Sequence, residues 1–179
     1  MPEHELVIDR TWNGAHAEPG ERLSVRLQTS ASELRICIDA PFHDDPAPPM
    51  PRGTCPTLWE YETVELFVAG AGEGYLELEF GPHGHHLALC FSAVRQRVVG
   101  VEPPIAYDVA RAGSRWLGMA ILSRTLLPGG PHRFNAYALH GTGSARRYLA
   151  WSPVPSTSPD FHQPKYFQRL ELAQKCCQQ

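Results

Sequence analysis

The sequence predicts an all-β domain, an antiparallel β-sandwich or jelly roll with little helix. Short runs in which apolar and polar residues alternate recur along the whole chain, and such runs are typical of half-buried strands. The 17 prolines and 15 glycines disfavour long helices, because proline breaks a helix and glycine weakens it. Helical patterns do not separate the runs, as they would in a doubly wound parallel sheet.

The predicted strands follow one another at short intervals. They occupy residues 5–8, 22–27, 34–39, 63–69, 75–80, 86–91, 94–99, 106–110, 115–122, 133–140, 146–151 and 167–172. Turn-forming residues separate them, and one helical turn is expected at 123–127 with Ser123 as its N-cap. Residues 41–56 form a long proline-rich loop, and loops of this length tend to be functional or mobile. We expect one domain over residues 1–173 and a flexible tail over 174–179.

Composition excludes several classes of function. The net charge of −3 and a pI near 6.3 provide no basic field for nucleic acid. No apolar run is long enough to span a membrane, and the N-terminus has no features of a secretory signal. Five cysteines without a CxxC spacing indicate a reduced, intracellular and cytoplasmic location. Lipidation at Cys176-Cys177 is not favoured, because the residue that follows is not aliphatic. The oligomeric state stays open.

Carboxylates alternate with apolar residues in the strongest local signal, which begins at LWEYETVELF. Within residues 63–69, Glu65 lies on the face opposite the core, and within 75–80 the same holds for Glu77 and Glu79. The short turn between these runs predicts an antiparallel hairpin, so the three carboxylates share one non-core surface. An ordinary solvated sheet face would show the same alternation, and that interpretation stays open.

Aromatic residues beside amide and carboxylate groups are typical of sugar sites, where the apolar face of a sugar stacks on a ring. Trp59 follows the proline-rich loop directly, and Trp151 and Phe161-His162 lie on further proline-containing loops. Asn135 points away from the core in its predicted strand. The alternative is that Trp151 and Phe167 are core aromatics, and we favour that interpretation for Phe167.

Histidines offer a weaker hypothesis, a divalent metal ion at His83, His85 and His140, with Glu79 as a further ligand. No spaced ligand motif such as HExxH supports it, and no calcium-binding loop is recognisable. We therefore expect no cofactor.

Several segments carry a resemblance to known proteins. The run LWEYETVELF, the strand ending in GPHGH, FNAYALH, AWSP and DFHQPKYF resemble carbohydrate-binding module family 9, a β-sandwich related to DOMON domains. Residues 6–172 as a whole resemble a small uncharacterised eukaryotic family typified by the human chromosome 4 open reading frame 33 product. The resemblance implies the fold and, by analogy, a binding site.

The sugar-binding modules suggest roles for individual residues. Trp59 corresponds to one wall of an aromatic sandwich, Glu65 to a glutamate that bonds sugar hydroxyls, and Asn135 to a late-strand amide. Phe161 stands where an opposing tryptophan is expected, and Glu77 stands where the modules use an arginine. The acidic replacement changes charge and donor pattern, so the modules' sugar specificity does not transfer. The candidate ligand-binding residues are Trp59, Glu65, Glu77, Asn135, Trp151, Phe161 and His162.

Three hypotheses for function follow. The first is a non-catalytic domain that binds a glycan or another polar small molecule, with residues 41–56 as one wall of the site. The second is a glycoside-processing enzyme that pairs Glu65 with Glu77 or Glu79. The two carboxyl groups of such a pair lie about 5–5.5 or 6.5–9.5 Å apart. The third is a protein-interaction module without a small ligand. We favour the first, because catalysis also needs a carboxyl with a raised pKa, which a sequence does not reveal.

Overall fold

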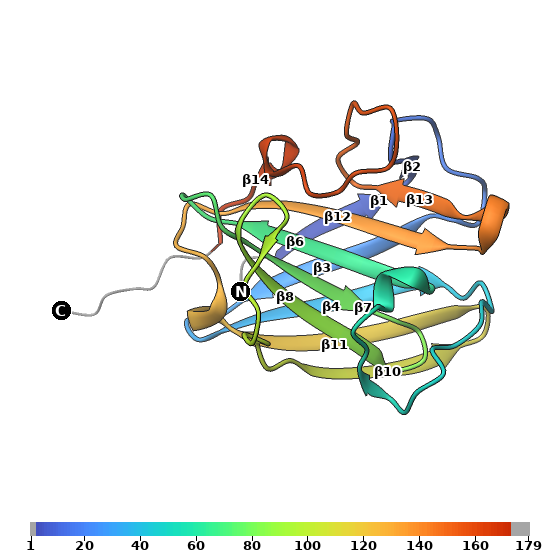
Figure 1. Ribbon diagram of the computed structural model, residues 1–179. Helices are drawn as coiled ribbons and strands as arrows, with labels where there is room; N and C mark the ends of the chain where they lie inside the picture. The colour runs from blue at the N-terminus through green and yellow to red at the C-terminus, as the bar shows by residue number, and fades with distance from the viewer. Residues whose placement is uncertain (1–2, 173–179) are drawn as a thin grey trace.

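The protein folds into two β-sheets packed face to face, as seen in a computed structural model that describes residues 3–172 (Figure 1). The smaller sheet has five antiparallel strands in the order β1-β3-β4-β11-β10. They are β1 (Glu3–Ile8), β3 (Leu23–Thr29), β4 (Glu33–Pro41), β11 (Arg115–Ser123) and β10 (Ala106–Ala112). The predicted antiparallel β-sandwich is confirmed.

The larger sheet has nine strands, with a central path β2-β13-β12-β6-β7-β8-β5. Their bounds are β2 (Arg10–Thr11), β13 (Arg147–Ala150), β12 (Arg133–His140), β6 (Thr63–Ala69), β7 (Tyr75–Phe80), β8 (His85–Ala93) and β5 (Gly53–Thr54). Two short strands lie off this path: β14 (Gln168–Arg169) pairs with β12, and β9 (Gln96–Arg97) pairs with β8. β5 runs parallel to β8, and the other pairs are antiparallel.

The main core fills the space between the sheets. Strand alternation directs every second residue inward, as for Leu66 of β6, Leu78 of β7 and Ile36 of β4, each fully buried. Trp116 of β11 is the largest side chain in this core and is 1% exposed. Burial of such side chains contributes about 1.5–3 kcal/mol each, which makes this layer the main source of stability.

A second apolar cluster covers the outer face of the larger sheet. Phe67, Tyr75 and Tyr137 project outward from β6, β7 and β12 and pack with Phe167 from the C-terminal segment. A one-turn 3-10 helix, η1 (Leu58–Glu60), covers the same face with Leu58. As a result all residues of β6 and β7 are buried, on both sides of the sheet. Of the two interpretations left open by the alternation, the ordinary solvated sheet face is therefore wrong for β6 and β7.

Most predicted elements lie where the sequence places them. The helical turn forms as η2 (Arg124–Leu126), and the Ser123 side chain accepts a hydrogen bond from the Thr125 amide as its N-cap. The run 94–99 contributes only the two residues of β9, and residues 42–52 have no regular structure. Two further 3-10 turns are η3 (Gly143–Ala145) and η4 (Pro164–Tyr166).

No helix in the described part of the chain is long and apolar enough to cross a membrane. Cys37, Cys55 and Cys90 are free thiols. The expected tail at 174–179, with Cys176 and Cys177, lies outside the described residues.

Candidate functional site

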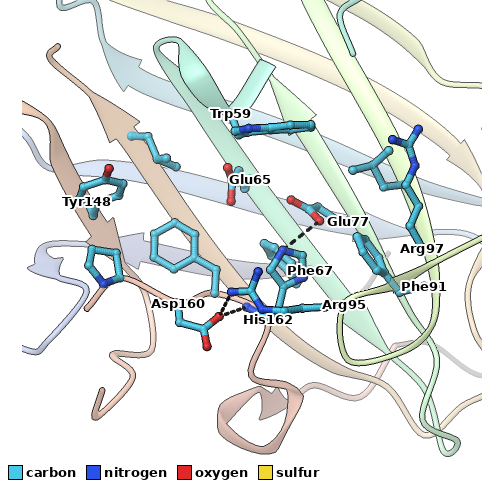
Figure 2. A pocket seen from close by; sticks show the side chains of 14 residues that line it. Trp59, Glu65, Phe67, Glu77, Phe91, Arg95, Arg97, Tyr148, Asp160 and His162 are labelled. Atoms are coloured by element: carbon cyan, nitrogen blue, oxygen red, sulfur yellow. Dashed lines mark hydrogen bonds and ion pairs between the residues drawn. The ribbon is translucent and has the colours of Figure 1, made fainter. Parts of the chain in front are cut away.

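A cavity of about 490 Å³ opens on the outer face of the larger sheet (Figure 2). Strands β6, β7 and β8 form its floor, and η1 and the loop before η4 form its sides. The lining residues are Trp59, Glu65, Phe67, Glu77, Leu89, Phe91, Arg95, Arg97, Leu139, Tyr148, Pro159, Asp160, Phe161 and His162. Its volume is within the range of about 300–1,000 Å³ that is typical of small-molecule sites.

Three carboxyl groups meet at the floor of the cavity. Glu65 of β6 pairs with Glu79 of β7 across the hairpin, and Phe67 pairs with Glu77. One carboxylate oxygen from each of Glu65, Glu77 and Glu79 lies within 4.8 Å of the other two. The side-chain alternation of a two-stranded ladder places them together, as the sequence predicts. All three residues are buried, with 2%, 4% and 0% of their surface exposed.

Burial dominates the electrostatics of this cluster. It raises the pKa of Glu77 to about 7. Burial and the nearby Glu77 carboxylate raise the pKa of Glu65 well above its ordinary value, and burial with both neighbours does the same for Glu79. Within residues 3–172, Glu77 Oε2 and both Glu79 oxygens have no hydrogen-bond partner. In the ionised state these oxygens therefore lack donors, whereas a protonated Glu79 can donate to Glu77.

Arg146 is the cation that partly offsets the raised pKa of Glu65. Its guanidinium, however, donates to the backbone carbonyls of Trp59, Tyr61 and Gly141, at 2.8, 2.8 and 2.9 Å. These bonds hold the η1 segment that carries Trp59 against the end of β12. Arg146 therefore acts mainly as a brace for one wall of the cavity.

A chain of hydrogen bonds fixes His162 at the opposite side. The Arg95 amide donates to the Tyr75 hydroxyl at 3.1 Å, and this hydroxyl lies 2.7 Å from His162 Nδ1. The other ring nitrogen, Nε2, lies 3.9 Å from Glu77 Oε2. Burial, and secondarily Arg95, lowers the pKa of His162 to about 4. A neutral His162 does not neutralise the carboxyl beside it.

Asp160 and Arg95 close the rim of the cavity next to His162. The Arg95 guanidinium donates to Asp160 at 2.6 Å, and Asp160 also accepts from the His162 amide at 3.2 Å and from Gln163 at 2.7 Å. Arg95 itself has a φ of 59°, which is uncommon for a residue other than glycine. Its left-handed backbone lets the β8–β9 turn present the amide to Tyr75 and the guanidinium to Asp160 at once.

Aromatic rings form the walls. Trp59 is 39% exposed, and its ring lies above Glu65 and Glu77 (Figure 2). The Phe161 ring stacks on Tyr137, with centroids 3.9 Å apart and planes 8° apart, and its edge meets Tyr148 at 6.2 Å. Stacking on a buried ring holds Phe161 in place before any ligand arrives. These surfaces offer flat, rigid apolar contacts for the face of a ring-shaped ligand.

The structure brings together five of the seven candidate residues: Trp59, Glu65, Glu77, Phe161 and His162 all line the cavity. Asn135 and Trp151 are not among its lining residues.

Asn135 is fully buried beneath the cavity and has its own partners. Its amide donates to the Tyr137 hydroxyl at 2.6 Å and the Ser152 carbonyl at 2.8 Å, and its oxygen accepts from the Ala136 and Ser152 amides. Trp151 packs against the main core. The loop 41–56 contributes no lining residue to this cavity either.

The three histidines of the metal hypothesis make separate contacts. His83 Nε2 lies 3.4 Å from the Asp45 carbonyl, His85 Nε2 lies 3.0 Å from the Met50 carbonyl, and His140 Nε2 lies 2.8 Å from Glu21. In residues 3–172, the group with oxygens close enough to hold an ion is instead Glu65, Glu77 and Glu79.

Sequence reasoning missed the rim residues Arg95, Arg97 and Tyr148. Arg95 lies in the turn between β8 and β9, and Arg97 lies in β9 itself. Strand β8 lies beside the carboxylate strand β7. A prediction that extended the hairpin by one strand would have placed them near Glu77. Tyr148 had no such signal, because its position depends on the pairing of β13 with β12.

Known proteins of similar sequence cover almost the whole chain. The human UPF0462 protein C4orf33 is 36% identical, over 94% of this chain and 88% of that protein. The zebrafish homologue (Danio rerio) is 35% identical, over 94% of this chain and 89% of that protein. No family model matches the sequence.

Solved structures of similar fold are more distant in sequence. A putative carbohydrate-binding protein from Bacteroides uniformis has a TM-score of 0.71 at 16% identity, and covers 92% of this chain and 84% of that chain. A carbohydrate-binding module of family 9 from Caldicellulosiruptor kristjanssonii, in complex with cellotriose, has a TM-score of 0.58 at 12% identity. It covers 92% of this chain and 80% of that chain. At these identities the likeness is one of fold.

Proposed function

This chain belongs to the UPF0462 protein family, and we propose that it is a non-catalytic binding domain whose cavity takes a carbohydrate or another polar small molecule. The observation that supports this most is the combination of aromatic walls at Trp59 and Phe161 with unpartnered acceptors on the floor. A sugar presents an apolar face to a ring and hydroxyl donors to carboxylates, so it matches both surfaces. The fold shared with carbohydrate-binding proteins agrees with this proposal.

The depth of the cavity favours a small ligand over a flat protein interface. About 490 Å³ lies beneath Trp59, and the walls are braced by Arg146 and by the Asp160 network. Such preformed concave sites are typical of small-molecule binding. An interaction module would instead present an exposed apolar patch.

Titration calorimetry with a panel of neutral mono- and disaccharides tests the proposal. We expect binding that Trp59→Ala weakens at least tenfold, because the wall above the floor is removed. Trp12→Ala removes a half-buried tryptophan outside the cavity and is the matched control, with unchanged affinity. Absence of binding across the panel, or equal loss in both variants, would contradict a carbohydrate site at this cavity.

A glycoside-processing enzyme is the second candidate, supported by the proximity of Glu65 and Glu77. One oxygen of each lies within 4.8 Å of the other, which is close to the carboxyl separation of about 5–5.5 Å in retaining glycosidases. Retention needs one ionised and one protonated carboxyl, however, and burial raises the pKa of both residues here. Release of a fluorophore from aryl glycosides that Glu65→Gln abolishes would establish this activity, and no release with wild-type protein would remove it.

A further inference from the structure

The cavity holds more carboxyl groups than free cationic side chains, and this imbalance restricts what can bind there. Glu65 and Glu77 face the cavity, and Glu79 lies beside Glu65 as its cross-strand partner. Of the nearby cations, Arg95 is paired with Asp160 at 2.6 Å, and Arg146 donates to backbone carbonyls. Arg97 remains at the exposed rim. Within residues 3–172, the carboxyl groups of the floor therefore form no direct ion pair with an arginine or lysine.

The imbalance is clearest at the side chain of Glu77. It is 4% exposed, lines the cavity, and its Oε2 atom has no partner in the described chain. His162 Nε2 lies 3.9 Å from this atom, beyond hydrogen-bond distance. Burying such an acceptor without a donor costs about 1–3 kcal/mol. A ligand that supplies donors and positive charge at this point removes that penalty.

Aromatic rings surround the same point. Phe67 and Phe91 line the cavity on the β6 and β8 sides, and Trp59 lies above the carboxyl groups (Figure 2). Carboxylates together with ring faces bind organic ammonium groups, because the ring face attracts a cation that the carboxylate also pairs. A bare metal ion would use the carboxylates alone and leave most of the about 490 Å³ empty.

We propose that the ligand carries a protonated primary amine, which binds between Glu77 and Glu65 on the floor of the cavity, beneath Trp59. This inference rests on the proposed function, and within it names amino sugars as the carbohydrate class. An ammonium group has three donors, enough for Glu77 Oε2 and for one oxygen of Glu65. N-acetylation removes the charge and two of the donors, so an N-acetyl sugar is discriminated against.

Proton linkage provides an independent sign of this binding mode. Glu77 has a pKa of about 7 without ligand, so part of the population holds a proton at neutral pH. A bound ammonium favours the ionised carboxylate and lowers that pKa, so binding releases a proton to the buffer. A neutral sugar exerts no such charge effect.

The experiment compares sugars that differ only at the amine. Calorimetry at pH 6.5 uses D-glucosamine, D-glucose and N-acetyl-D-glucosamine, and the corresponding galactose series, with chelator-treated full-length protein. We expect the amine to bind at least tenfold more tightly than the neutral sugar. The heat of glucosamine binding should depend on the ionisation enthalpy of the buffer, as proton release requires.

Variants locate the effect. Glu77→Gln keeps the shape of the side chain and should reduce the amine preference to less than threefold, and Glu65→Gln is the second test of the same contact. Glu73→Gln, at an exposed glutamate in the β6–β7 turn, is the matched control and should keep the full preference. Circular dichroism confirms folding of each variant before titration.

The outcomes separate this inference from the proposed function. Neutral and amine sugars that bind equally, or a preference that survives both variants, would overturn the amine contact and leave carbohydrate binding intact. Calcium ions that bind the chelator-treated protein and displace glucosamine would also overturn it, because the cluster would then be a metal site. If no sugar binds in either form, the proposed function fails first.

Discussion

Replacing Glu77 by glutamine should reduce the loss of stability that the protein suffers as pH rises, although the residue lies in the proposed site. The ordinary pKa of a glutamate here is 4.5, and burial raises that of Glu77 to about 7. Between these pH values the folded state holds a proton that the unfolded state has released. The free energy of unfolding therefore falls as pH rises from 4.5 through 7, and the loss is complete above the folded pKa.

The magnitude follows from the same two values. At about 1.4 kcal/mol per pH unit, the displacement from 4.5 to about 7 amounts to about 3 kcal/mol of the free energy of unfolding. Glutamine cannot ionise, so Glu77→Gln escapes this loss. The amide itself alters the free energy of unfolding by the same amount at every pH. The informative quantity is therefore how the stability difference between variant and wild type changes with pH.

Urea unfolding followed by circular dichroism at pH 5 and pH 8 provides that quantity. Relative to wild type, Glu77→Gln should gain about 2–3 kcal/mol between the two pH values, since part of the displacement lies below pH 5. Glu73→Gln, the exposed control, should show no such gain. Profiles for wild type and Glu77→Gln that stay parallel within about 0.5 kcal/mol would refute the reasoning, because then burial places no penalty on the ionised carboxylate.

Three further outcomes are expected. Asn135→Ala should lower the free energy of unfolding, measured in urea, by about 3 kcal/mol, because buried backbone groups that now bond to the Asn135 side chain would have no partner. A loss under about 1 kcal/mol would mean that water replaces the amide. Burial alone would raise the pKa of Glu21, but hydrogen bonds from Arg147 and its neighbours lower it to about 2. Its stabilisation is thus lost as pH falls from 4.5 towards 2, and acid unfolding of Glu21→Gln should begin at higher pH, as fluorescence would detect. Gly70→Ala should lower the melting temperature because its Cβ would collide with the backbone of the β11–β12 loop, whereas Gly72→Ala, with open space around it, should not; equal melting temperatures would contradict this packing.

The strands of the site could be predicted because their alternation is local. In β6 and β7 the period of two assigns Glu65, Glu77 and Glu79 to one face, and a short turn makes the hairpin the simplest connection. The aromatic at the end of a proline-rich loop, Trp59, was likewise recognisable from its position in the sequence. The resemblance to carbohydrate-binding modules supplied Phe161.

Burial of that face could not be predicted, because it depends on contacts between distant segments. The loop before η4 folds back over the sheet and brings His162 to Tyr75, 87 residues away in the sequence. The same loop turns Asn135 from a candidate ligand contact into a support for its own backbone, through Ser152. Arg95 reaches the rim through a left-handed turn residue, for which an arginine gives no sequence signal.

Because β6 and β7 are covered on both faces, the acidic floor also determines how these strands align. Apolar side chains point both ways from them, so burial of apolar surface alone would tolerate a slip of one residue along the ladder. A slip of β6 would drive Glu65 into the space between the sheets, and a slip of β7 would do the same to Glu77 and Glu79. An uncompensated carboxyl group there costs several kcal/mol. Variants without these three carboxyl groups would therefore lose more than a ligand contact. They would also lose the energetic penalty that disfavours the wrong pairing of the central hairpin.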